Sequence, residues 1–92
     1  MLILFYFVTP EMVNELEKQA IEKHNSDIYG QIDERKREIE KHEAVINQCN
    51  QAIQDKDTEH WERKEYQQVK EERIQSIKKE RETIKSLKLL LK

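Results

Sequence analysis

The side chains best suited to metal chemistry in this chain are three histidines and a single cysteine. His42 and Cys49 lie seven residues apart, a spacing that puts both on one face of a helix. A zinc site needs three or four converging ligands, usually in pairs with short spacings. No such pairing occurs here, so we interpret His42 and Cys49 as neighbours on a helical seam. We predict neither a metal site nor a cofactor.

A second candidate for metal chemistry is the acidic segment that begins at Asp55. Asp55, Asp57 and Glu59 alternate as the first ligands of a calcium-binding loop do. However, the sixth position is His60 instead of Gly, and the twelfth is Tyr66 instead of Glu. Because the sharp turn and the bidentate ligand are both missing, the segment is interpreted as a solvated connection between helices.

The residues that could serve in catalysis are also poorly placed. A nucleophile needs an adjacent base, and a phosphate-binding loop needs several glycines. Ser26, Ser76 and Ser86 lie in a predicted loop and on charged helices, and Gly30 is the only glycine. We therefore predict that the protein is not an enzyme.

Composition favours one small helical domain over residues 1–92. Charged residues make up 39% of the 92 positions, and there is one Gly and one Pro, which is typical of long helices or a coiled coil. The net charge of −2 gives no overall attraction to nucleic acid. A lone cysteine cannot form an intrachain disulfide, which fits a reducing compartment, and we predict a cytoplasmic location.

The apolar opening "LILFYFV" predicts a short β-strand over residues 1–9. It is too short to span a bilayer and lacks the basic start of a secretory signal. Thr9 and Pro10 then read as the N-cap and first position of a helix. Since no second strand follows in the sequence, we expect this segment to pair with a second copy of the chain or with a partner's sheet. The alternative is that it is helical and continues across Pro10 with a kink.

Three helices are predicted after the strand, over 10–24, 31–54 and 58–91, with a loop at 25–30 where Asn25, Ser26, Asp27 and Gly30 supply turn residues. In the preferred architecture, residues 55–58 turn the chain and the last two helices form a long antiparallel hairpin. The C-terminal leucines then overhang and lie beside the start of the chain. The alternative is one continuous helix from about residue 31 in a dimeric coiled coil.

The functional hypothesis that follows is a helical protein-interaction module, a small adaptor or inhibitor of the kind encoded by phages and mobile elements. Homodimerisation is favoured, together with an unidentified protein partner. Isoleucines recur every seven residues from Ile32, and a coiled-coil seam of this kind joins chains. The predicted self-association residues are Ile3, Phe5, Phe7, Ile32, Ile39, Ile46 and Ile53; the predicted partner-binding residues are Tyr29, Trp61 and Tyr66.

Two alternative functions remain open. A structural or scaffolding coiled coil would form large assemblies. A nucleic-acid-binding regulator would use the basic C-terminal helix, because lysine and arginine neutralise phosphates. Binding to a membrane surface is disfavoured, because the apolar face of that helix is needed inside the hairpin. The residues assigned to nucleic-acid binding are Arg73, Lys78, Lys79, Arg81, Lys85 and Lys88.

Overall fold

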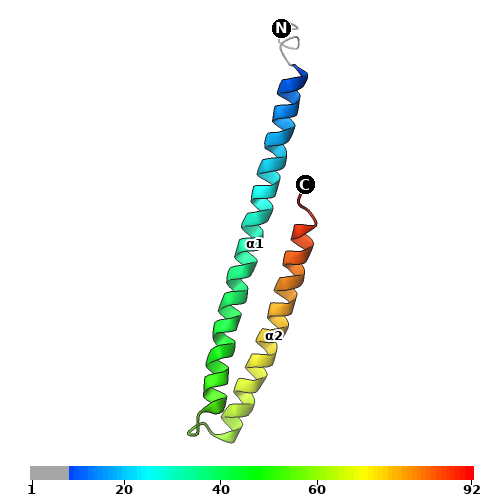
Figure 1. Ribbon diagram of the computed structural model, residues 1–92. Helices are drawn as coiled ribbons and strands as arrows, with labels where there is room; N and C mark the ends of the chain where they lie inside the picture. Colours follow the sequence, from blue (N-terminus) through cyan, green and yellow to red (C-terminus); the bar gives the residue numbers. More distant parts are fainter. Residues whose placement is uncertain (1–8) are drawn as a thin grey trace, which may run out of the picture.

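The computed structural model describes residues 9–92, which form two long antiparallel helices (Figure 1). Helix α1 spans Pro10–Gln54 and helix α2 spans His60–Lys88, and residues 55–59 reverse the chain between them. The predicted helical hairpin is thus confirmed. The alternative of one continuous helix from residue 31 is wrong, because the chain turns after Gln54. The predicted strand falls, apart from Thr9, outside the described residues.

The start of α1 follows from its first two residues. Thr9 is extended, and its Oγ1 accepts a hydrogen bond from the backbone N–H of Met12 at 3.2 Å. This bond satisfies one of the backbone donors that a helix leaves free at its N-terminus. Pro10 follows at a position where its missing N–H has no cost, and Glu11 places a negative charge at the positive end of the helix.

The loop predicted at 25–30 does not exist, because α1 continues without a break from Pro10 to Gln54. Gly30 is helical, with no positive φ. A glycine inside a helix costs only about 1 kcal/mol relative to alanine. Burial of Ile28 and Ile32, which are 5% and 3% exposed, outweighs that cost. Tertiary packing therefore overrides the turn preference of the local sequence.

The reversal at residues 55–59 is organised by Asp55. Its Oδ1 accepts a hydrogen bond from the backbone N–H of Asp57 at 3.0 Å, which is an Asx-turn. Its carbonyl oxygen accepts a bond from Nη2 of Arg63 at 2.9 Å, which ties the turn to α2. The N-cap residue of α2 is Glu59, two positions later than the predicted start of the last helix at residue 58 would place it, and its side chain makes no capping hydrogen bond. An acidic side chain thus supplies the turn chemistry without glycine or proline.

The core is a narrow line of side chains between the helices. Its main cluster consists of Ile28, Ile32 and Ile84, with Ile39, Leu87 and Leu91 packed against it. The C-terminal leucines pack close to the middle of α1, and α2 ends at Lys88. The overhang predicted at the C-terminal end is therefore wrong. The projecting segment belongs to α1, because this helix is 45 residues long and α2 is 29.

Candidate interaction surfaces

Polar side chains on the seam side of α1 pair with polar side chains of α2 across the hairpin. Nη1 of Arg73 lies 3.0 Å from Nδ1 of His42, and the pair is partly buried. An imidazole nitrogen in this position accepts the bond, because guanidinium can only donate. Nη1 of Arg35 lies 3.5 Å from Oε2 of Glu80. The seam therefore combines apolar layers with polar pairs, and His42 contributes to packing between the helices.

The isoleucines assigned to self-association lie along this intramolecular seam. Ile32 is buried in the core cluster, Ile39 packs against it, and Ile46 and Ile53 are half-buried in the same heptad phase. A second chain could reach Ile32 only if the hairpin opened. Ile3, Phe5 and Phe7 lie outside the described residues.

The tip of the hairpin carries an exposed aromatic group. Trp61 is 58% exposed, and its Nε1 donates to Oε2 of Glu59 at 2.6 Å. Tyr66 and Val69 are partly exposed further along α2. Tyr29 is also exposed, but it lies on α1 near the open end of the hairpin, opposite the turn at 55–59. Trp61 and Tyr66 both lie on α2, about 140° apart around the helix, so the three predicted partner-binding residues do not form one cluster.

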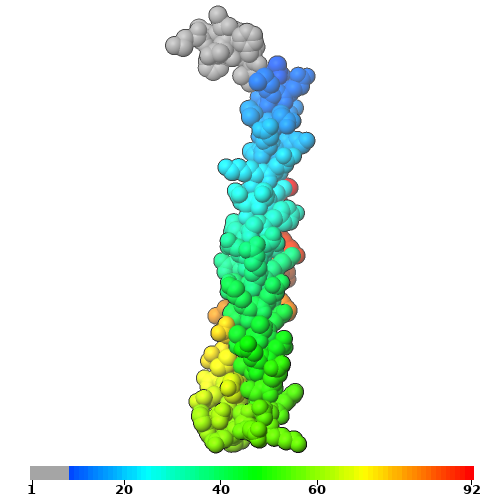
Figure 2. All heavy atoms as spheres, turned by 90° about the vertical axis from the view of Figure 1, so that its left-hand side faces the viewer, coloured from blue at the N-terminus to red at the C-terminus, as the bar shows by residue number. Residues whose placement is uncertain are grey.

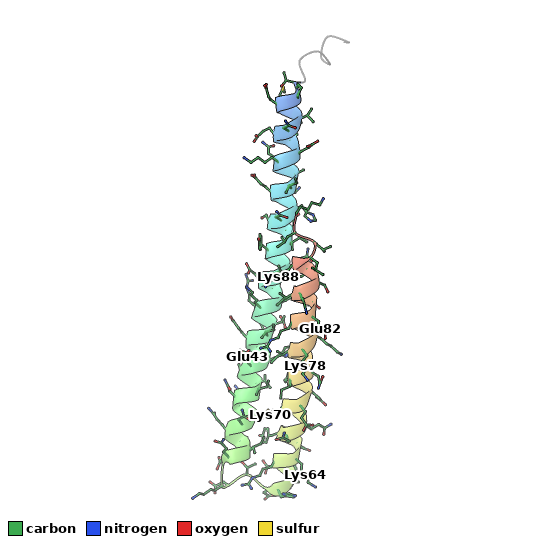
Figure 3. All side chains as sticks on the ribbon, turned by 45° about the vertical axis from the view of Figure 1, so that its right-hand side comes forward. Glu43, Lys64, Lys70, Lys78, Glu82 and Lys88 are labelled. Carbon is green, nitrogen blue, oxygen red and sulfur yellow. The ribbon has the colours of Figure 1, made fainter. Side chains whose placement is uncertain are left out.

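The basic residues assigned to nucleic-acid binding fall into two groups. Arg73 belongs to the seam, where it binds His42, and the spacing of Lys79 directs it to another side of α2. The other four are exposed and lie three or four residues apart, so they share one face of the helix. Figure 3 labels two of them on α2, Lys78 and Lys88. We call this face the basic stripe: Lys78, Arg81, Lys85 and Lys88.

A further exposed apolar surface, which the sequence did not predict, lies at the N-terminal end of α1. The hydrogen bonds between α1 and the C-terminal residues begin at His24 and Asn25, which bond to Leu90 and Lys92. Every residue from 10 to 23 is exposed. We call residues 10–23 the overhang; Figure 2 shows its blue end standing clear of the red C-terminal residues.

The overhang carries large apolar side chains that face solvent. Met12 is 51% exposed, Leu16 is 62% exposed, and Val13 and Ile21 are 41% exposed each. In the predicted architecture, a loop at 25–30 followed this helix and the C-terminal leucines lay beside the start of the chain. Because α1 is continuous, these side chains project beyond α2 instead.

Within residues 9–92 there is no group of three or more metal-ligating His, Cys, Asp or Glu side chains. Over the same residues, neither helix has the length and hydrophobicity to cross a membrane. A shallow depression on α1 is lined by charged side chains of that one helix and offers no apolar wall for a small molecule. Its lining residues are Glu34, Arg35, Arg37, Glu38 and Lys41.

Comparisons with known proteins give no match, whether with protein-family models, with curated proteins or with solved structures.

Proposed function

We propose that this protein is a non-enzymatic helical interaction module that self-associates and binds another protein, as a small adaptor or inhibitor does. The observation that carries the proposal is the overhang, where four large apolar side chains are each more than 40% exposed on one continuous helix. Contiguous exposed apolar surface is typical of interaction sites in soluble proteins.

Self-association is the first part of the proposal, and sedimentation velocity over a concentration series tests it. We expect a reversible dimer at tens of micromolar, with the monomer dominant on dilution. The substitution Leu16→Glu places a charge on the apolar face and should shift the equilibrium toward monomer. The matched control is Gln48→Glu, an exposed position on the paired part of α1. A wild-type chain that stays monomeric throughout would contradict self-association.

The second part of the proposal assigns partner binding to the tip. Exposed tryptophan and tyrosine side chains are frequent anchors of protein interfaces. Here the bond from Trp61 to Glu59 holds the indole ring in one orientation. This pre-organisation reduces the entropy that a partner must remove on binding.

To test the tip, a partner protein is first captured by affinity to the immobilised wild-type protein and is then purified. We expect Trp61→Ala to weaken its binding by about 2 kcal/mol, roughly 30-fold in Kd, and Lys64→Ala on the same exposed turn to leave binding unchanged. Equal binding of wild type and Trp61→Ala, measured by calorimetry, would contradict the assignment to the tip.

The basic stripe supports a second candidate function, namely binding to nucleic acid. Four exposed cations on one helical face can contact phosphates in a row. Titration of a fluorescent duplex tests this candidate: binding should fall steeply with salt, and Lys85→Gln with Lys88→Gln should reduce that salt dependence. Absence of binding at low salt would remove this function.

A further inference from the structure

The overhang and the basic stripe carry opposite charge. Residues 10–23 contain four glutamates against two lysines, whereas residues 78–92 contain six lysine or arginine side chains against two glutamates. Both segments lie at the open end of the hairpin, because Asn25 bonds to Lys92. The overhang is thus an acidic and apolar helix that extends from the basic end of the molecule.

The charges on the two segments also match in spacing. Glu11 and Glu15 lie four residues apart, as do Arg81 and Lys85. Residues four apart on a helix share one side, so each pair forms a short line along its helix. Arg81 has only a weak intramolecular partner, since its Nη2 lies 4.0 Å from Oε1 of Glu43 and both side chains are mostly exposed.

Resting on the proposed self-association, we propose that the overhang of each chain docks on the basic stripe of a second copy in a closed two-fold dimer. The two helices run parallel, with Glu11 beside Arg81 and Glu15 beside Lys85 of the other copy. In this alignment Glu22 reaches the level of Lys92 of the other copy. Leu16 and Ala20 are within about one helical turn of the level of its Leu89 and Leu90 along the axis, but they lie about 140° around the overhang from Glu11 and Glu15, so the docking contact is mainly ionic.

The geometry closes because Lys92 is level with Asn25 of its own chain. If Glu22 of one copy is level with Lys92 of the other, it is also level with Asn25 of that copy. The relation is reciprocal, so both overhangs dock at once and neither an overhang nor a basic stripe is left free for a third chain. Docking also covers Leu89 and Leu90, which are 83% and 53% exposed in the single chain.

A charge-swap experiment tests this dimer. The double substitution Arg81→Glu with Lys85→Glu places like charges opposite Glu11 and Glu15, and Glu11→Lys with Glu15→Lys does the same from the other side. Each variant alone should dimerise at least about tenfold more weakly than wild type, because like charges face each other in both overhang–stripe contacts of the dimer. Circular dichroism is the check that each variant remains helical.

The mixture of the two variants is the decisive sample. The heterodimer has two docking contacts. In one, the wild-type glutamates of the overhang face the wild-type Arg81 and Lys85; in the other, the introduced lysines face the introduced glutamates. Both contacts are therefore attractive. We expect the mixture to form a heterodimer with affinity near that of wild type, measured by sedimentation and by fluorescence transfer between labelled chains. Lys64→Glu with Lys79→Glu is the control, because it reverses two exposed charges of α2 outside the stripe and should leave the dimer unchanged.

Each contrary outcome has a defined meaning. A dimer that tolerates Arg81→Glu with Lys85→Glu would overturn the docking geometry and leave self-association standing. A concentration-dependent series of larger species would overturn the closed dimer in favour of staggered chains. A mixture that stays monomeric would also overturn the geometry. A wild-type chain that is monomeric at every concentration would overturn self-association as well.

Discussion

At the scale of single residues, Ile32 is the side chain on which the hairpin most depends. It is 3% exposed and lies in the cluster with Ile28 and Ile84. We expect Ile32→Ala to lower the free energy of unfolding by about 2–4 kcal/mol, because it removes buried methyl groups and leaves a cavity.

Ile21→Ala is the matched control, since Ile21 is 41% exposed on the overhang. It should cost less than about 1 kcal/mol when the monomer is unfolded. Urea denaturation at a concentration below the dimer range measures both variants. Equal losses would show that the core does not lie where the hairpin places it.

The pair of His42 and Arg73 is the shortest polar side-chain contact between α1 and α2 among the described residues. The nitrogens lie 3.0 Å apart in a partly buried position, whereas Arg35 and Glu80 meet at 3.5 Å, with the Arg35 side chain 44% exposed. In double-mutant cycles to alanine we expect a coupling energy of about 0.5–1.5 kcal/mol for His42 with Arg73 and a smaller one for Arg35 with Glu80. A coupling near zero for both pairs would mean that apolar contacts alone hold the helices together.

At the scale of elements, the sequence was sufficient wherever a local preference and the packing agreed. Thr9 and Pro10 predicted the start of α1. The repeat of isoleucines predicted a seam, but one between chains, whereas in the structure Ile32 and Ile39 pack against α2 of the same chain. At residues 25–30 the two conflicted: four residues favoured a turn, while Ile28 and Ile32 fitted a continuous helix. The free energy gained by burying Ile28 and Ile32 depends on α2 lying beside them, which the local sequence does not specify.

The same conflict explains what could be predicted of the interaction surfaces. The exposed Trp61 was identified as a candidate anchor because a large aromatic residue in polar sequence is unusual. The overhang was missed, because its exposure depends on whether the chain turns back after residue 24. Two apolar stripes lie along α1: one in the overhang and one in the seam from Ile28 onward. Only the packing of α2 determines which of them is covered within the chain.

Gly30 provides a direct test of the continuous helix. It is exposed, its φ is not positive, and a Cβ added to it would meet no atom within 4 Å. Gly30→Ala should therefore raise the free energy of unfolding by about 0.5–1 kcal/mol, because alanine has the higher helix propensity and restricts the unfolded chain. Thermal and urea unfolding measure the gain. A loss of stability would mean that residues 25–30 turn in solution, as the sequence alone suggested.

At the scale of the whole molecule, the hairpin is a thin rod with extents of 81 × 19 × 17 Å. A rod two helices thick buries little of its surface, and here only five side chains are buried among the described residues. A third helix seated on the pair would enlarge the core without a longer chain. The proposed dimer supplies this third helix on each side of its two-fold axis.

The length of the dimer distinguishes this arrangement from one in which only the two overhangs pair. In the proposed dimer, residue 22 of one copy is level with residue 25 of the other. The C-terminal end of each α1 then lies about 17 residues, or about 25 Å, beyond the N-terminal end of the other copy's α1. Pairing through overhangs alone, centred near residue 17, would add about 45 Å. Small-angle X-ray scattering above the dimerisation concentration should therefore give a rod only about 25 Å longer than the monomer but distinctly thicker. A rod of unchanged thickness and greater length would assign the contact to the overhangs alone, and then Arg81→Glu with Lys85→Glu should leave its affinity unaffected.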